Sequence, residues 1–227
     1  GTHFMWENRD IRYNVLRAVG YYKGKPVAED LIVFKGLEQA PNFELLYQDD
    51  KKILKGEAGY NYLYRLNCGG DDYTDSFGQL WLQDNTNYSH SWAENFKDLN
   101  PYLASQRTTN DPIRGTCDWK LFQHFRFGRH QLEYRFPVAD GTYRIELYFT
   151  EPWHGTGGSA STDCEGLRIF DVAVNDSVVL DDLDIWAESG HDGVCKKVVY
   201  ATVTGGMLRI HFPEVKAGQA LISGIAI

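Results

Sequence analysis

The sequence predicts an all-β protein, a β-sandwich or jelly roll, and three observations support this. Helical periodicity is almost absent along the 227 residues. Short runs of alternating apolar residues recur at regular spacing, and Gly, Asn and Asp turn signals separate them. The chain has 22 Gly and 32 aromatic rings (6 Trp, 14 Tyr, 12 Phe), which suits many tight turns around a ring-filled core.

The first predicted strands are residues 11–22 and 26–34, on either side of a hairpin-type turn at residues 23–25. Two strands alone are not stable in water, so they either complete the later sheet or belong to an upstream domain. Residues 37–59 are mixed and polar, and we interpret them as a linker or an added strand pair. The next strand is predicted at 60–68, where tyrosines alternate with other residues.

The second half of the chain contains most of the predicted strands. They cover residues 131–138, 142–150, 167–174, 177–180, 196–203, 207–212 and 220–227. Turn pairs lie between several of them, at Asp140-Gly141, Asn175-Asp176 and Gly205-Gly206. Two stretches without period remain, 85–119 and 151–166. Loops of this length are usually functional or disordered, and the many rings in the first favour function.

Charge and composition exclude several classes of protein. The net charge of −8 argues against nucleic-acid binding, because an acidic surface repels phosphates. No apolar run approaches the roughly 18 residues of a membrane-spanning helix, and residues 1–10 lack the features of a secretory signal. We therefore expect no membrane partner. The four Cys are expected to be unpaired, with Cys164–Cys195 as the best exception.

Candidate catalytic and metal groups are weak. Glu151 with Asp163 or Glu165 is the best carboxylate pair for glycoside hydrolysis, but Glu151 ends a strand. Ser161, His154 and Asp163 lack the context of a nucleophile elbow. Two acidic groups could hold structural Ca²⁺, and neither has EF-hand spacing, so solvated turns explain them and we expect no metal and no cofactor. They are Asp71, Asp72 and Asp75, and Asp181, Asp182 and Asp184.

Several motifs of the chain resemble the malectin-like domain, a lectin β-sandwich of the galactose-binding-like type. They are NCGG at 67–70, LFQHFRFGRHQLEYRFPV at 121–138, YFTEPW at 148–153, FDVAVND at 170–176 and DLDIW at 182–186. The resemblance implies a malectin-like carbohydrate-binding domain over residues 60–227. YTDSFGQLWLQD, RGTCDWKLFQ and EPWHGTGG more narrowly resemble the malectin-like module at the C-terminus of bacterial family 2 glycoside hydrolases of the β-galactosidase type. LRAVGYYKGKPVAED resembles the last strands of the immunoglobulin-like domain before it, so residues 1–36 are expected to be a β-hairpin remnant of that domain.

The resemblance also implies a sugar site built from rings on several loops and an acidic residue near the C-terminus. Phe127 matches one ring, and Trp153 and His154 match the aromatic pair after the strand-ending Glu. Trp92 or Tyr88 would supply the ring of the first long loop, and Trp119 is a further candidate. Lys216 to Gln219 occupy the region of the acidic residue, so Gln219 is the polar candidate there.

The sequence therefore predicts a non-catalytic glycan-binding module of a larger family 2 glycoside hydrolase. Its partners would be an oligosaccharide or polysaccharide and the other domains of the parent enzyme, in a periplasmic or extracellular setting. The alternative is a structural module that packs on the parent and binds no sugar. Exposure of Trp153, His154 and Trp92 around one concavity would separate the two.

Overall fold

The computed structural model describes residues 5–227 except 47–48, 50–51, 85–104, 130–131 and 156–162, and the described part is nearly all β. The elements are β1 (Val15–Tyr22), β2 (Lys25–Val33), η1 (Phe43–Leu46), β3 (Arg65–Asn67), β4 (Tyr73–Thr74), β5 (Leu80–Gln83), β6 (Ser105–Thr108), α1 (Trp119–Gln123), β7 (His124–Gly128), β8 (Glu133–Pro137), β9 (Gly141–Phe149), β10 (Ile169–Val174), β11 (Ser177–Leu183), α2 (Ile185–Ser189), β12 (Cys195–Val203), β13 (Met207–His211), β14 (Val215–Ala217), β15 (Ala220–Ile222) and β16 (Gly224–Ala226).

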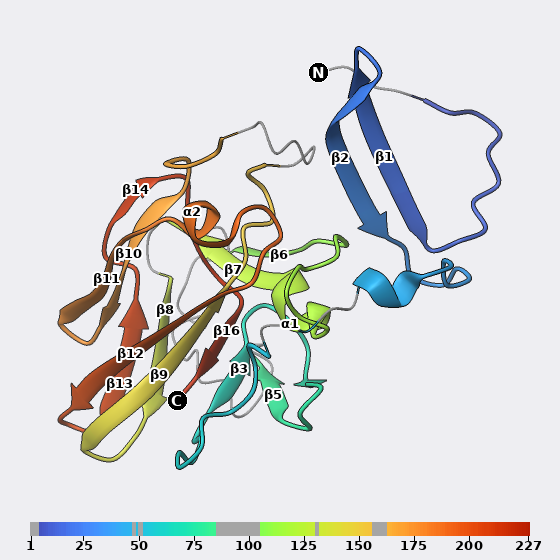
Figure 1. The fold of residues 1–227 in the computed structure, drawn as a ribbon. Coiled ribbons are helices and arrows are strands. Elements are labelled where there is room, and N and C mark those ends of the chain that lie inside the picture. Colours follow the sequence, from blue (N-terminus) through green and yellow to red (C-terminus); the bar gives the residue numbers. More distant parts are fainter. Residues whose placement is uncertain (1–4, 47–48, 50–51, 85–104, 130–131, 156–162) are drawn as a thin grey trace.

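Two large sheets face each other across the main core (Figure 1). One runs in the order β12-β9-β16-β3-β5-β4, and the other is β11-β10-β13-β8 with β14 beside β10. Alternate residues of β9, including Ile145, Leu147 and Phe149, meet Phe170 and Ile210 from the opposite sheet. A three-stranded sheet, β15-β7-β6, adjoins this core through Phe125 and Leu221. The predicted all-β sandwich is confirmed.

The turn pairs connect strands in two different ways. Asn175-Asp176 joins β10 to β11 as a hairpin, with Asn175 at φ 51°. Asp140-Gly141 and Gly205-Gly206 instead join strands of opposite sheets, because β9 and β12 pair with each other while β8 pairs with β13. These two turns therefore carry the chain across the sandwich, which the turn signal alone does not reveal.

A second core covers the outer side of β9. Its members come from Ile53 and Leu54, from β5, from α1 and from β9 itself, and Trp81 packs edge-on against Tyr148 at 5.3 Å. Residues 37–59 contribute Phe43, Ile53 and Leu54 to this core, and their described part contains a 3-10 helix and no strand. The segment is thus packed against the sandwich.

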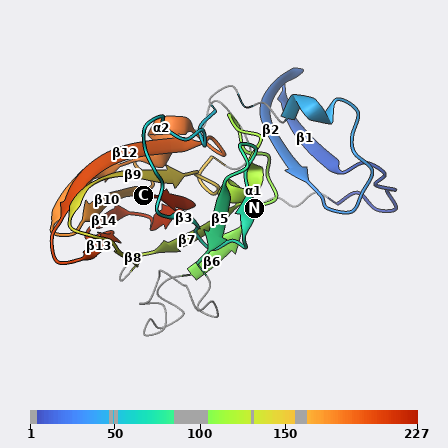
Figure 2. The ribbon, with the colours of Figure 1, turned by 90° about the horizontal axis from the view of Figure 1, so that it is seen from below.

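The β1–β2 hairpin stands beside the sandwich and joins neither large sheet (Figure 2). It is antiparallel over its full length, from Val15 opposite Val33 to Tyr22 opposite Lys25. Its contact with the rest of the chain is limited: Val15 and Val33 pack on the second core, and the Val33 amide donates to the Asn110 carbonyl at 3.0 Å. The assignment of residues 1–36 to a separate domain stays a prediction.

Two sequence predictions change in detail. The predicted strand 60–68 shortens to β3, because the Leu63 and Tyr64 amides both donate to the last carbonyl, of Ile227, outside any regular ladder. None of the four cysteines forms a disulfide, so the Cys164–Cys195 exception is wrong. The NCGG motif forms the turn after β3, where a Cβ on Gly70 would lie 2.3 Å from the Asn67 side chain, so the position requires glycine.

Candidate functional site

A pocket of about 350 Å³ opens at the end of the sandwich where β9 finishes. Its walls come from β6, β7, the segment after β9, the start of β10 and the turn between β14 and β15. They are formed by Arg107, Phe125, Phe127, Arg129, Pro152, Trp153, His154, Arg168, Gly218, Gln219 and Leu221. We call it the Trp153 pocket. It brings together four of the residues that the sequence predicted for one site, Phe127, Trp153, His154 and Gln219.

The segment after β9 is folded around the carboxylate of Glu151. Pro152 cannot donate to a β ladder, so the strand ends there and the chain turns outward. Glu151 is completely buried, and its Oε1 accepts hydrogen bonds from the amides of Trp153 and His154, both at 3.0 Å. With its backbone held in this way, the Trp153 ring projects from the fold and is 65% exposed.

Gly155 closes this segment against the domain. It has a φ of 90°, and a Cβ there would lie 2.9 Å from Nε1 of Trp186 and 3.0 Å from the His191 side chain. Both the conformation and the close packing demand glycine. The segment that carries Trp153 and His154 is therefore fixed at both ends, by Glu151 and by Gly155.

Arg168 connects two walls of the pocket. Its guanidinium pairs with both oxygens of Glu151, and it also donates to the Gln219 carbonyl at 2.6 Å. Burial opposes ionisation of Glu151, but the bonds from Arg168 and from the two amides outweigh it and lower the pKa of Glu151. The carboxylate is consequently ionised at neutral pH and serves as a structural anchor.

The floor and rim of the pocket combine rings with donors. Phe127 is half-buried and lies 6.2 Å from Phe125, and the exposed guanidinium of Arg107 lies 6.0 Å above its ring. Gln219 and Arg129 also line the pocket and are exposed. Flat rings beside polar side chains suit a ligand that has apolar C–H faces and hydroxyl edges.

Other predicted site residues lie elsewhere or outside the description. Trp119 is wrong as a pocket residue: it is 4% exposed, sits in the second core and packs edge-on against Phe43 at 5.8 Å. The ring of Trp119, at the start of α1, covers the outer side of β9, which explains why this residue is buried. Tyr88 and Trp92 lie outside the described residues.

The sequence analysis missed the three arginines of the pocket. Arg107 lies in none of the quoted motifs, and Arg129, although it lies within the motif at 121–138, was not singled out as a site residue. Arg168 pairs with Glu151, 17 positions earlier in the sequence. The spacing patterns of a single helix or strand do not extend over such a separation. A buried arginine beside a buried strand-ending glutamate becomes visible only when the strands are assembled.

The catalytic and calcium alternatives also receive a structural explanation. Glu151, the better half of the carboxylate pair, is committed to Arg168 and to backbone amides. Asp75 is buried and accepts from the Trp81 indole at 2.9 Å and from two turn amides. Asp184 caps α2, and Asp182 pairs with Lys216. These acids thus hold turns and helix ends.

Comparison with known proteins assigns the family. The sequence profile described as the malectin domain matches residues 62–227. The chain belongs to the malectin domain family. Malectin from Danio rerio is 25% identical over 166 residues, covering 70% of this chain and 52% of that protein. The chain thus spans about half the length of the curated relatives it matches.

Solved structures share the fold of this malectin domain. A β-glucuronidase from Bacteroides uniformis superposes with a TM-score of 0.58 at 24% identity, over 93% of this chain and 22% of that chain. The plant receptor-like kinase FER superposes with a TM-score of 0.54 at 17% identity, over 73% of this chain and 48% of that chain. Among the described residues, no helix is long and apolar enough to span a membrane.

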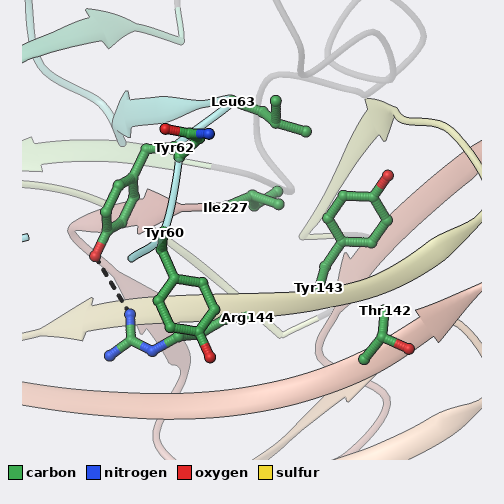
Figure 3. Close-up of a pocket in the computed structure, with 8 residues that line it drawn as sticks. Tyr60, Tyr62, Leu63, Thr142, Tyr143, Arg144 and Ile227 are labelled. Atoms are coloured by element: carbon green, nitrogen blue, oxygen red, sulfur yellow. Dashed lines mark hydrogen bonds between the residues drawn. The ribbon is translucent and has the colours of Figure 1, made fainter. Parts of the chain in front are cut away.

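The malectin domain has a second hollow, of about 260 Å³, near the start of β9 (Figure 3). We call it the Tyr60 hollow, and its lining is Tyr60, Asn61, Tyr62, Leu63, Thr142, Tyr143, Arg144 and Ile227. Arg144 donates to the hydroxyl of Tyr62 at 3.3 Å and lies 5.3 Å from the centre of the Tyr60 ring. The hydroxyl of Tyr143 donates to the Ala139 carbonyl at 2.7 Å.

Proposed function

We propose that the Trp153 pocket binds carbohydrate and that the chain is a non-catalytic glycan-binding module. The observation that carries the proposal is the exposed indole of Trp153 on a backbone braced by a buried ion pair. Leaving a large ring in water costs about 25 cal/mol per Å² of apolar surface. A braced, exposed ring beside Phe127, His154 and Gln219 offers a sugar one apolar face and several polar contacts.

We further propose that the module belongs to a larger family 2 glycoside hydrolase of the β-galactosidase type. The sequence resemblance of residues 16–30 and 73–84 to such enzymes supports this, and a β-glucuronidase contains the same fold in a segment of its chain. The module would then hold the parent enzyme near its polysaccharide, outside the cell or in the periplasm. The same fold occurs in the ectodomain of the plant receptor ANX2 from Arabidopsis thaliana.

A glycan array probed with the full 227-residue chain tests the sugar-binding proposal. We expect selective binding to a limited group of glycans, with dissociation constants of about 10 μM to 1 mM, equivalent to roughly −7 to −4 kcal/mol. Trp153→Ala should remove that signal, and Val178→Ala, which shortens an exposed side chain of β11, is the matched control. An empty array for the wild-type chain would favour the packing module without sugar affinity.

The chain itself should not hydrolyse glycosides. Glu151 is buried against Arg168 and cannot reach a glycosidic bond, which catalysis by a carboxylate pair requires. Incubation with aryl β-galactosides and aryl β-glucuronides at micromolar protein should give no release of the aryl group above the buffer rate. Turnover that disappears in Glu151→Gln would overturn the binding-only proposal.

A further inference from the structure

Three side chains from distant segments converge behind the Trp153 pocket. They are Asp111, between β6 and α1, and His191 and Asp192, between α2 and β12; one ligand-type atom from each lies within 4.8 Å of the other two. We call this group the His191 cluster. It is separate from the pocket lining, and the sequence analysis did not identify it.

The tautomer of His191 is set by the segment that carries the pocket rings. Its Nδ1 donates to the carbonyl of His154 at 3.1 Å. In the neutral ring this bond leaves the lone pair on Nε2, as in histidines that bind metals and donate their other nitrogen to a carbonyl. Nε2 faces Oδ2 of Asp192 at 2.9 Å. A lone pair and a carboxylate oxygen at that distance repel each other unless a proton or a cation lies between them.

The carboxylate of Asp192 has an unused position. The residue is 7% exposed, and its Oδ1 is buried with no hydrogen-bond partner among the described residues. A buried oxygen of this kind destabilises the fold, more so when it is charged, unless something binds it. The second carboxylate, of Asp111, is half-buried, and its Oδ2 accepts a hydrogen bond from the hydroxyl of Thr109 at 2.5 Å.

The backbone fixes the cluster as a preformed unit. The Asp192 amide donates to the Glu151 carbonyl at 2.9 Å, and the Asp192 carbonyl accepts from the Arg114 amide at 2.8 Å. Arg114 directs its guanidinium to the carbonyls of Ser189 and His191, at 3.0 and 2.6 Å. The imidazole and the two carboxylates are therefore held close together by the surrounding backbone.

We propose that the His191 cluster is a binding site for a first-row divalent cation of the Zn²⁺ class, with Nε2 of His191 and the carboxylates of Asp192 and Asp111 as its ligands. At the tetrahedral angle, ligands at about 2.0–2.1 Å from a zinc ion are separated by about 3.3–3.4 Å, so an ion between Nε2 and Oδ2 requires their 2.9 Å separation to widen by about half an ångström. A set of one imidazole and two carboxylates fits zinc, whereas calcium prefers oxygen ligands alone. Three protein ligands leave a coordination position for water.

Zinc binding to the metal-stripped full-length chain tests the site directly. Equilibrium dialysis against ZnCl₂ at neutral pH, followed by metal analysis, measures the bound zinc. The wild-type chain should bind about one Zn²⁺ more per chain than the double variant Asp111→Asn/His191→Gln. Each single variant should weaken binding by at least about tenfold, the smaller of the losses seen when metal-site partners are removed. Excess Ca²⁺ should not displace the Zn²⁺.

Asp181→Asn is the matched control, because it changes an exposed member of a second acidic group, Asp171, Asp181 and Asp182, and should leave zinc binding at the His191 cluster intact. If His191→Gln does not fold, Asp111→Asn decides, because Zn²⁺ should raise the unfolding temperature of the wild-type chain and not of this variant. Zinc binding that is absent in the wild type, or equal in wild type and Asp111→Asn, overturns the proposal. Neither result depends on sugar binding.

Discussion

The Trp153 pocket and the Tyr60 hollow lie at opposite ends of β9, and both are lined by aromatic rings. They differ in what their polar groups do. In the Tyr60 hollow, Tyr62 donates to Glu146 at 2.9 Å, and Arg144 contacts Tyr60, Tyr62 and Glu146 together. In the Trp153 pocket, the buried pair of Arg168 and Glu151 holds backbone groups, and the largest ring projects into solvent.

This difference shows that the number of rings does not identify a binding site. Rings whose hydroxyls and faces already contact protein groups contribute to the stability of the sheet. A ring that is largely exposed on a rigid backbone can stack on a ligand and loses little entropy on binding. We therefore assign recognition to the Trp153 end of β9 and structural support to the Tyr60 end.

The largest expected effect on stability is that of Arg168→Met. It leaves the buried Glu151 carboxylate without its cation, a change that typically costs about 3–5 kcal/mol. Arg144→Met at the other end should cost less, about 1.5–3 kcal/mol, because Lys196 still lies 3.0 Å from Glu146. Urea unfolding of both variants measures the difference. Equal losses would show that the two ion pairs brace the sheet equally.

Acid should weaken both ends of β9 through their glutamates. Burial opposes ionisation of Glu146, but hydrogen bonds from Tyr148 and Arg144 and the charge of Lys196 lower its pKa, and the pKa of Glu151 is also lowered. Because the pKa of each glutamate is lower in the folded chain than in the unfolded chain, its ionisation stabilises the fold above about pH 4.3. This stabilisation is lost as the pH falls through the folded-state pKa.

Urea unfolding between pH 7 and pH 3 measures this loss. Glu151→Gln should flatten the decline, because that variant lacks one of the two titrating groups. A decline of unchanged steepness in Glu151→Gln would show that other carboxylates control acid stability.

Deletion of residues 1–36 should have a smaller effect than either arginine variant. The hairpin joins neither large sheet and contacts the second core mainly through Val15 and Val33. Residues 37–227 should still unfold cooperatively, with a melting temperature only a few degrees lower, because about 1 kcal/mol corresponds to about 2–4 °C for a chain of this size. Differential scanning calorimetry measures it. A truncated chain without a cooperative transition would make the hairpin part of the sandwich.

Most of the strands were predictable because their signals are local. Alternation on β9 and the Asn175 turn depend on neighbouring residues only, and the structure has both. The pairing of β12 with β9, instead of with β13 across the turn at Gly205, was not predictable, because it depends on how two sheets close over one core. The family resemblance placed Trp153, His154 and Phe127 in one pocket. The burial of Trp119 and the pairing of Arg168 with Glu151, 17 residues away, could not be predicted, because both depend on how the sheets assemble.

We assign sugar recognition to the Trp153 end of β9. The most direct test of this assignment is to titrate a glycan selected on the array into three proteins. The proteins are the wild-type chain, Trp153→Ala and Tyr60→Ala, and calorimetry gives their affinities. Trp153→Ala should lose more than about 1 kcal/mol of binding free energy with little change in melting temperature, and Tyr60→Ala should bind as the wild type does. Full binding by Trp153→Ala, or loss of binding in Tyr60→Ala alone, would contradict the account.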